Sequence, residues 1–242
     1  MDHVTRNINN LTTLWETVGT AFNTLHKETL YNYCYVPGSD WPNRVWLSPG
    51  AGEEAVLQAI AAVKTLPHKL TYSHWSGIDE AEPSLFENAG LALKSTQVGM
   101  SLPLQAPLPE PGRLQLRRIQ DVSQAATWET LYPQSFGYRI SAETVVRTMQ
   151  QIPYFLIHFG QEVIGTVIAK RTGEIIGVHA LGIIPAFRKR GFAEEAMAVL
   201  LNAARENGAT LATLQASQLG KGIYSRMGFS DDFVVRNYHL PA

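Results

Sequence analysis

The sequence is poor in cysteine and in charge, and each shortage excludes a class of protein. Cys34 is the single cysteine among 242 residues, so no intrachain disulfide can form. Charged residues make up 17% of the chain, and 20 Lys and Arg against 21 Asp and Glu give a formal net charge of −1. A chain this close to neutral has no general basic surface for nucleic acid or an anionic membrane. A site for an anion must therefore be local.

Long apolar runs and targeting signals are also missing. No stretch approaches the roughly 18–20 continuous apolar residues of a membrane span. The N-terminal residues are polar and lack the layout of a signal peptide. No group of Cys and His residues has the spacing of a zinc site. We therefore expect a cytoplasmic protein that binds no metal, with Cys34 as a buried spectator thiol.

Apolar residues make up 45% of the chain, which is ample for a packed core. The length allows one large domain or two smaller ones. Four prolines fall between residues 103 and 111, and Gly112 follows them. This density continues neither a helix nor a central strand, and it predicts an extended linker. We therefore divide the chain into an N-terminal domain, residues 1–105, a proline-rich linker, residues 106–112, and a C-terminal domain, residues 113–242.

The C-terminal domain alternates strands and helices in a regular order. Apolar patterning and turn signals predict strands at 114–118, 154–159, 163–171, 175–184 and 211–215, with a final pair of strands in 229–239. The predicted helices cover residues 121–132, 141–151, 192–207 and 220–227. This order predicts a mixed α/β layer with a meander in its middle.

Three consecutive cations, Arg188, Lys189 and Arg190, precede Gly191 at the start of the strongest predicted helix. A helix N-terminus presents unpaired N–H groups and a partial positive charge, and a glycine lets an anion approach the backbone. The segment therefore predicts a local phosphate site. A solvated turn with scattered charges is the alternative, because short basic turns with glycine are common. A P-loop fits less well, because its terminal Gly-Lys-[Ser/Thr] is absent.

Two motifs in this domain resemble those of the GNAT superfamily of N-acetyltransferases. Arg188-x-x-Gly191-x-Ala193, which follows a predicted strand ending Leu-Gly-Ile-Ile-Pro, resembles the acyl-CoA pyrophosphate motif [QR]-x-x-G-x-[GA]. The run from Ile223 to Phe229 resembles the family's L-Y-x-x-x-G-F signature. Their order and separation also fit the family, and the resemblance covers about residues 113–240.

The resemblance implies that acetyl-CoA is the acyl donor and that Tyr224 protonates the departing CoA thiolate. Ser217 stands where many members have asparagine, so its contact with the cofactor is an open question, although a hydroxyl can make it. The other implied cofactor-binding residues belong to a strand end and to the pyrophosphate loop: Leu181, Gly182, Ile183, Arg188, Lys189, Arg190, Gly191, Phe192 and Ala193.

Acetylation of an amine also needs a group that takes the proton of the ammonium. His179 is the expected base, because its ordinary pKa suits the task and strand alternation places it on the same face as Leu181 and Ile183. Glu174 and water are the alternatives, and a hydrogen-bonded structural histidine is the other interpretation of His179. The resemblance implies that the loop between the first two helices lines the acceptor side. The residues expected there form an aromatic wall and a cation for a carboxylate: Tyr132, Phe136, Tyr138 and Arg139.

The N-terminal half looks like a degenerate copy of the same fold. Helices expected near 4–26, 53–66 and 82–89, with strands at 45–48, 70–75 and 98–104, follow the order of residues 178–240. Residues 88–91 correspond to 226–229, and Glu53-Glu54 corresponds to Glu194-Glu195. No Arg/Lys cluster precedes the first copy's helix, and Leu85 or Phe86 stands near the tyrosine position. Coincidental α/β similarity is the alternative.

We therefore predict an α/β protein with a GNAT-type mixed sheet flanked by helices, built as two GNAT-like halves in tandem. The expected function is transfer of an acetyl group from acetyl-CoA, by direct attack of a primary amine of a small molecule or peptide; the sequence does not distinguish acetyl from a longer acyl group. A non-catalytic acyl-CoA-binding or sensing module is the alternative. The expected partners are acetyl-CoA and the amine, with neither nucleic acid nor membrane, in a monomer or homodimer.

Overall fold

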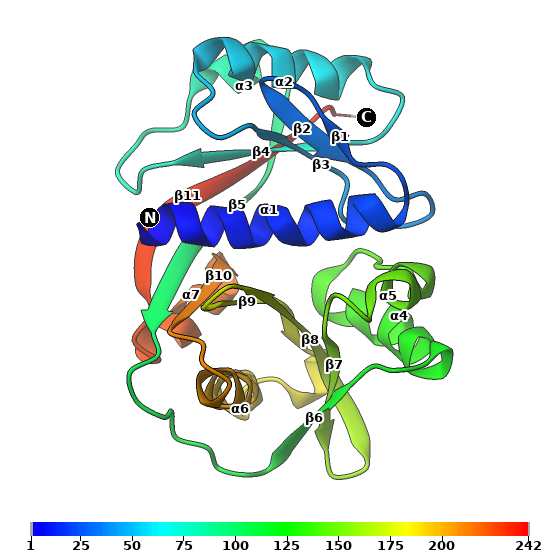
Figure 1. The fold of residues 1–242 in the computed structure, drawn as a ribbon, viewed down its shortest axis with the longest axis vertical. Helices are drawn as coiled ribbons and strands as arrows, with labels where there is room; N and C mark the ends of the chain where they lie inside the picture. Colours follow the sequence, from blue (N-terminus) through cyan, green and yellow to red (C-terminus); the bar gives the residue numbers. More distant parts are fainter. Residues whose placement is uncertain (1, 242) are drawn as a thin grey trace.

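The computed structural model describes residues 2–241, which form one mixed sheet flanked by helices (Figure 1). The helices are α1 (His3–Ala21), α2 (Glu53–Thr65), α3 (Ser84–Asn88), α4 (Val122–Phe136), α5 (Ala142–Thr148), α6 (Phe192–Glu206) and α7 (Gln218–Arg226), with a 3-10 turn η1 (Pro185–Phe187). The strands are β1 (His26–Lys27), β2 (Tyr31–Cys34), β3 (Arg44–Leu47), β4 (Thr71–Ser76), β5 (Ala92–Pro103), β6 (Leu114–Arg118), β7 (Tyr154–Phe159), β8 (Glu162–Thr172), β9 (Ile175–Ile183), β10 (Leu211–Ser217) and β11 (Ser230–His239).

The sheet has the order β1-β2-β3-β4-β11-β5-β10-β9-β8-β7-β6. Two neighbouring pairs are parallel, β3 with β4 and β9 with β10, and each is connected by one helix, α2 or α6. A short helix, α3 or α7, then leads to the last strand of each half, β5 or β11. The two halves therefore repeat one β-α-β-α-β order, as the sequence comparison of residues 1–105 with 178–240 predicted.

The two halves exchange their last strands. The final strand β11 pairs with β4 and β5 of the N-terminal half, whereas β5 lies between β11 and β10. In Figure 1 the two strands run between the upper and lower parts of the molecule. The proline-rich linker packs on α6, where Asn202 Nδ2 donates to the Leu108 carbonyl and Asn202 Oδ1 accepts from the Leu108 N–H, both at 2.8 Å. The linker therefore divides the chain but not the sheet.

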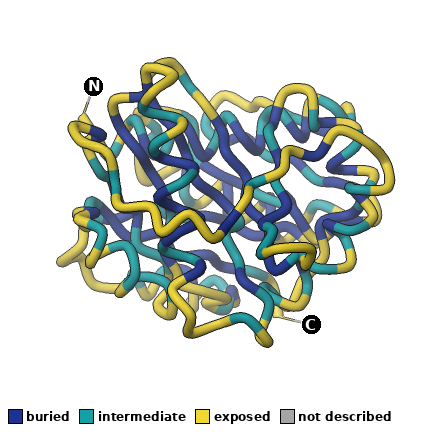
Figure 2. Tube along the Cα trace, turned by 90° about the horizontal axis from the view of Figure 1, so that it is seen from below, coloured by how far each residue is buried: buried dark blue, intermediate teal, exposed yellow. Residues whose placement is uncertain are grey.

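Helices cover both faces of the sheet. In the C-terminal half, α6 and α7 pack on one face, and α4 and α5 pack on the other. Helix α1 runs across the centre of the molecule (Figure 1), where it packs on the sheet and contacts β5, β8 and β9. The buried parts of the chain follow the strands through the interior, and the exposed parts lie mainly on the connecting loops (Figure 2).

Local sequence signals account for several element ends. The Asp121 side chain caps α4 by accepting from the Gln124 N–H at 2.8 Å, as predicted. Several predicted ends were wrong: α1 stops at Ala21, β5 begins at Ala92, α4 continues to Phe136 and α5 stops at Thr148. The expected final pair of strands is one strand, β11, because the irregularity after Asp231 is a register shift rather than a turn.

Within residues 2–241, no helix is both long and apolar enough to cross a membrane. The same residues contain no group of three or more His, Cys, Asp and Glu side chains that could hold a metal ion.

Candidate active site

The parallel strands β9 and β10 separate part-way along their length. They pair from Ile175 opposite Leu211 to Gly177 opposite Thr213. Beyond this point β9 continues to Ile183 with β8 on one edge, and no strand in the described part of the chain pairs with its other edge. The free edge carries the peptide groups of Leu181, Gly182 and Ile183, the residues expected to hold the pantetheine arm.

A bulge interrupts β9 beside this free edge. Thr166 of β8 pairs with Gly182, but Ile168 pairs with His179, so β9 contains one residue more than β8 over the same interval. Ala180 has a φ of 53°, in the left-handed region that non-glycine residues rarely adopt. The bulge therefore reverses the alternation of side chains along β9.

The reversal changes the face on which His179 lies. Leu181 and Ile183 pack into the apolar cluster beneath α6, whereas the His179 ring faces α1 and contacts Asn10. The expectation that His179 shares a face with Leu181 and Ile183 is therefore wrong. Strand periodicity cannot reveal a bulge, because the period of two holds only where pairing is regular.

His179 is held between two amide side chains. Its Nδ1 lies 3.1 Å from Gln215 Oε1, and its Nε2 lies 3.0 Å from Asn10 Oδ1. Both oxygens are fixed toward the ring, because Asn10 Nδ2 donates to the Lys170 carbonyl and Gln215 Nε2 donates to Asn7. Two acceptors favour the protonated ring, but burial lowers the pKa of His179 to about 4, with a further lowering from the Lys170 charge. Burial dominates, so the ring is neutral at pH 7.

Glu174, the other expected candidate for the base, lies in the turn that precedes β9. Its carboxylate is exposed, and it accepts from the Thr210 hydroxyl at 3.3 Å. The strands separate after Gly177, toward the opposite end of β9. Glu174 is therefore not beside the free edge.

The N-terminus of α6 is open to solvent. Gly191 precedes the helix with a φ of 78°, a conformation that glycine adopts at no steric cost, and no side chain caps the first turn. A Cβ at Gly191 would have one neighbour within 4 Å, the Arg113 Nη2 at 3.7 Å. The first N–H groups of α6, including those of Phe192 and Ala193, can therefore donate to an anion.

The three expected cations differ in their surroundings. Arg188 turns away from the helix start, because its Nε donates to the Ile183 carbonyl at 2.9 Å and its Nη2 donates to the Ser135 carbonyl at 3.4 Å. Arg190 lies over the Phe187 ring, with 5.2 Å between its Cζ and the ring centroid. Arg188 therefore connects β9 to the end of α4, although all three cations are exposed.

Arg113 is a further cation beside this loop. It forms an ion pair of 2.8 Å with the buried Glu195 and donates to the Arg190 carbonyl at 3.3 Å. Glu195 also accepts from the N–H groups of Arg113 and Leu114, which fixes the end of the linker to α6. Arg113 was not expected at this loop because it lies far from the motif in the chain, directly before β6.

Ser217 lies at the start of α7, and Tyr224 lies in its last turn. The Ser217 hydroxyl caps the helix by accepting from the Gly220 N–H at 3.3 Å. Tyr224 packs edge-on against Phe229, with 5.9 Å between ring centroids. Burial raises the pKa of Tyr224 to about 12, and its hydroxyl has no hydrogen-bond partner among residues 2–241. The phenol is therefore protonated at pH 7 and free to donate.

The expected aromatic wall forms at the end of α4. Phe136 stacks on Tyr132 with 4.5 Å between centroids, and the Tyr132 hydroxyl donates to the Tyr138 hydroxyl at 2.5 Å. Phe136 also lies against Gly182, where a Cβ would come within 2.5 Å of its ring. The wall therefore reaches the free edge of β9, and Gly182 is needed for this close approach.

Arg139, the cation expected for a carboxylate, is already engaged. Its Nε lies 3.0 Å from the Glu129 carboxylate, and its Nη2 donates to the Gly38 carbonyl at 2.7 Å. Its backbone N–H donates to the Asp40 carboxylate at 2.8 Å. Arg139 therefore links loops of the two halves.

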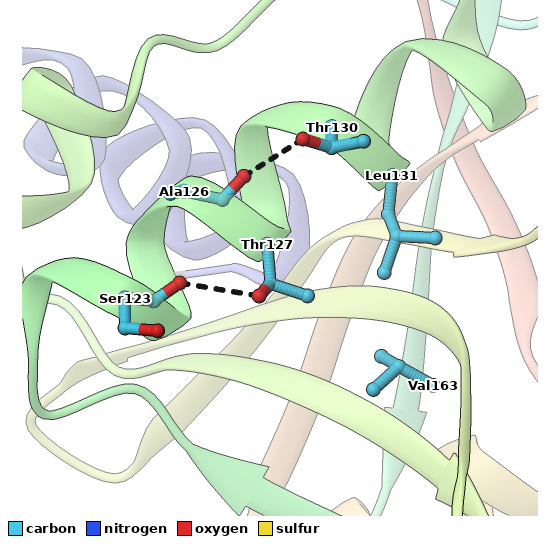
Figure 3. A pocket seen from close by; sticks show the side chains of 6 residues that line it. All are labelled: Ser123, Ala126, Thr127, Thr130, Leu131 and Val163. Carbon is cyan, nitrogen blue, oxygen red and sulfur yellow. Dashed lines mark hydrogen bonds between the residues drawn. The ribbon is translucent and has the colours of Figure 1, made fainter.

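The outer face of α4 carries an open hollow of about 540 Å³ (Figure 3). The Thr127 hydroxyl there donates to the Ser123 carbonyl at 3.1 Å, and the Thr130 hydroxyl donates to the Ala126 carbonyl at 3.0 Å. No titratable side chain lines it, so it carries no acid–base chemistry. Its lining residues are Ser123, Ala126, Thr127, Thr130, Leu131 and Val163.

Comparisons with known proteins agree with this geometry. Residues 116–229 match the Acetyltransferase (GNAT) family. The fold is therefore the GNAT-type mixed sheet, and the C-terminal half is a domain of the GNAT acetyltransferase family. No protein of curated function matches the sequence.

Solved structures share the fold across most of the chain. A GCN5-related N-acetyltransferase from Kribbella flavida is 17% identical with a TM-score of 0.66, and the match covers 96% of this chain and 95% of that one. One from Sphaerobacter thermophilus is 15% identical with a TM-score of 0.64, covering 88% and 78%. A tandem GNAT protein from the clavulanic acid biosynthesis pathway is 10% identical with a TM-score of 0.56, covering 88% and 79%. At these identities the matches show the fold.

Proposed function

We propose that the chain is an acetyl-CoA-dependent N-acetyltransferase that moves the acetyl group directly to a primary amine of a small molecule or peptide. One combination carries the proposal: the free edge of β9, the open N-terminus of α6 that follows it, and the unpartnered hydroxyl of Tyr224. An acyl transferase needs these three functions, which are to align a thioester, to hold its phosphates and to supply a proton.

The residues present fit acetyl-CoA. Its pyrophosphate would lie at the first N–H groups of α6, with Lys189, Arg190 and Arg113 around Gly191. Its pantetheine arm would pair with the free peptide groups of residues 181–183, and Ser217 would lie beside it at the start of α7. When bound, acetyl-CoA supplies an activated acyl group, so the protein needs no metal or nucleophile.

The side chains of the chain supply proton transfers. Tyr224 carries its proton at pH 7, because its pKa is raised to about 12, so its hydroxyl can donate a hydrogen bond to the sulfur of the departing thiolate. N–H groups on the free edge of β9 can donate to the thioester carbonyl. Together they stabilise the charge that develops on the acyl group and on the leaving group.

We propose His179 as the acceptor of the amine's proton, with water as the alternative. The neutral ring donates to one of its two amide neighbours, and an added proton lets it donate to both Gln215 and Asn10. The position of Glu174 at the other end of β9 argues against a role for its carboxylate. A pKa of about 4 keeps His179 unprotonated throughout the physiological range.

Direct transfer, without an acyl-cysteine intermediate, is supported by the surroundings of Cys34, the single cysteine. Its thiol is buried, its Sγ lies 3.7 Å from the Trp15 carbonyl, and burial raises its pKa to about 12. A thiol in this state is not a nucleophile.

The proposal is tested by measuring thiol release from acetyl-CoA with a panel of polyamines, amino acids, aminoglycosides and peptides. Steady release with at least one amine is expected. Tight acetyl-CoA binding without release by any amine would favour a non-catalytic acyl-CoA-binding module. His179→Ala is expected to shift the acidic limb of the kcat/KM profile, and an unchanged limb would assign the base to water.

A further inference from the structure

Glu195 is a buried carboxylate near the N-terminus of α6. Its side chain is 1% exposed. Its Oε1 accepts from the backbone N–H groups of Arg113 and Leu114 at 2.6 and 3.1 Å. Its Oε2 lies 2.8 Å from both Nε and Nη2 of the Arg113 guanidinium. A buried charge is tolerated when it is paired and hydrogen-bonded, and this carboxylate meets both conditions through one short segment.

The same contacts fix the Arg113 guanidinium beside the open helix start. Its Cζ lies 4.9 Å from the centroid of the buried Phe192 ring, and its Nη2 donates to the Arg190 carbonyl at 3.3 Å. A Cβ at Gly191 would lie 3.7 Å from the same Nη2. Nη1 has no hydrogen-bond partner among residues 2–241, and 43% of the side chain is exposed. The guanidinium therefore keeps the Nη1 donors for a ligand at the place where the first N–H groups of α6 are also open.

The motif cations Lys189 and Arg190 are held less firmly. In the described part of the chain, the ion pairs of α6 involve Arg113 and Arg226, and neither motif cation lies within ion-pair distance of a carboxylate. A side chain that is already fixed loses less conformational freedom when an anion binds than a mobile one does. Arg113 is therefore the pre-organised cation of this loop.

Glu195 has two opposite effects on an anion at this place. Its negative charge repels a phosphate, but the helix start is open to solvent, where the interaction between charges is weak and screened by salt. Its hydrogen bonds hold a guanidinium that can bind phosphate through charge-assisted hydrogen bonds. The second effect is the larger one, because the charge of Arg113 already offsets that of Glu195.

We propose that Glu195 is a positioning residue for the acyl donor, which holds Arg113 so that its guanidinium binds the pyrophosphate of CoA together with the first N–H groups of α6. The inference rests on the acetyl-CoA binding of the proposed function and is independent of acetyl transfer. It also reverses the sign that charge counting gives, because removal of a negative charge beside an anion site should weaken the binding of the anion.

Glu195→Gln tests this sign. The amide oxygen can keep the two backbone N–H groups, but the amide NH₂ then faces the Nε and Nη2 donors of Arg113 and releases the guanidinium. Calorimetric titration should show about 10-fold weaker binding of acetyl-CoA, the low end for a charge-assisted hydrogen bond because Arg113 is partly exposed. Equal or tighter binding of acetyl-CoA by Glu195→Gln would overturn the inference.

A second donor, acetyl-dephospho-CoA, identifies the phosphate that Arg113 binds. It retains the pyrophosphate and lacks the 3′-phosphate. Glu195→Gln should therefore lose the same factor in affinity for both donors. A loss confined to acetyl-CoA would assign Arg113 to the 3′-phosphate and contradict the pyrophosphate assignment.

Glu194→Gln is the matched control. Glu194 lies one residue earlier on α6, has a side chain that is 45% exposed, and pairs with Arg226 at 3.6 Å. The change removes the same charge from the same end of the helix and leaves the contacts of Arg113 intact. Affinity for acetyl-CoA should not fall. An equal loss in Glu194→Gln and Glu195→Gln would show an effect of charge on the helix and would exclude positioning.

Combination with Arg113→Gln separates positioning from a purely structural role. In that background Glu195→Gln should cause no further loss of affinity, because the group that it positions is gone. A further loss of about 10-fold would mean that Glu195 acts through the fold.

Two further measurements keep the inference testable. If Glu195→Gln fails to fold, Arg113→Lys keeps a cation beside Glu195 but has no second nitrogen for the phosphate, and it should also bind acetyl-CoA about 10-fold more weakly. Unchanged affinity of Arg113→Lys would contradict the inference. Failure of wild type to bind acetyl-CoA would overturn the proposed function as well, whereas wild-type binding with unchanged affinity in Glu195→Gln overturns the positioning role alone.

Discussion

The two halves of the sheet use one architecture with different residues at the equivalent positions. Helices α3 and α7 end in equivalent hydrogen bonds. After α3, the Leu91 N–H donates to the Phe86 carbonyl at 2.9 Å. After α7, the Phe229 N–H donates to the Tyr224 carbonyl at 3.0 Å. Phe86 is therefore the counterpart of Tyr224, which the sequence left open between positions 85 and 86.

The counterparts have different surroundings. Phe86 is fully buried, stacks on Tyr238 with 4.1 Å between centroids and packs against Tyr72 at 5.5 Å. Tyr224 keeps a free hydroxyl. Helix α2 starts after Gly52 with Glu53 and Glu54 in its first turn and no preceding cation. The proposed cofactor site of the C-terminal half combines a separated parallel pair of strands with a cationic helix start and a tyrosine, whereas the N-terminal half lacks the cations and the tyrosine. In the N-terminal half, the Phe86 ring packs against Tyr72 and Tyr238 at the equivalent position.

The largest expected effect comes from cutting the chain in the linker. Residues 1–108 and 109–242 expressed separately should neither fold nor bind acetyl-CoA, because each lacks the strand that the other inserts beside its own. Co-expressed pieces should reassemble. Circular dichroism and calorimetric titration measure both properties. A separate C-terminal piece that folds and binds acetyl-CoA would show that the halves are independent.

Gly191→Glu places a side chain and a negative charge at the open start of α6. Acetyl-CoA affinity should fall by several kcal/mol, at least about 100-fold. Gly52→Glu makes the same change at the start of α2, where φ is −90° and a side chain is tolerated, and should leave affinity unchanged. Gly191→Ala separates the strain of a positive φ from the charge. Equal affinity of Gly191→Glu and wild type would refute the assigned phosphate site.

Burial of His179 makes stability depend on pH. The unfolded chain protonates this histidine near its ordinary pKa of ~6.5, whereas the folded chain does so at about 4. The free energy of unfolding should therefore fall as pH falls from ~6.5 to ~4, by about 3 kcal/mol, with no contribution above that window. Urea titrations at several pH values should show most of this slope removed by His179→Gln.

His74 provides the control in the other half. Burial also lowers its pKa, but the residue is only half-buried. His74→Gln should therefore change the slope in the same direction and by less. An identical slope in His179→Gln and wild type would mean that His179 titrates normally in the folded protein.

Exchange of the aromatic residues gives the smallest effect. Tyr224→Phe should lower kcat by about 100-fold, the low end of general acid contributions, and leave acetyl-CoA binding unchanged. Phe86→Tyr should leave kcat unchanged and lower stability by about 1–3 kcal/mol, because the new hydroxyl is buried without a partner. Full kcat in Tyr224→Phe would make Tyr224 a packing residue.

The C-terminal elements were predictable because their signals are local. The patterns at 114–118 and 154–159 gave the observed bounds of β6 and β7, and Gly191 marked the start of α6. Two side-chain features were also predictable, because each depends on residues close together in the chain. They are the cap formed by Asp121 and the aromatic wall of Tyr132, Phe136 and Tyr138.

The features that sequence analysis missed depend on distant partners. No local pattern indicates that β5 pairs with β10, because β5 and β11 have strand character wherever they are inserted. The bulge at Ala180 appears only in the register between β8 and β9, and Arg113 reaches the α6 start from an element that lies apart in the chain. Strand β2 was missed because it has only four residues, although its tyrosines favour a strand.

The position of β11 imposes an order on biosynthesis. The N-terminal half leaves the ribosome with β4 and β5 synthesised but without the strand that separates them in the sheet. Until residues 230–239 emerge, both strands present unpaired edges, the kind of surface that draws intermolecular association during translation. Completion of the N-terminal half therefore waits for residues 230–239, and a ribosome stalled before residue 230 would hold a nascent chain with open strand edges, a substrate for chaperones.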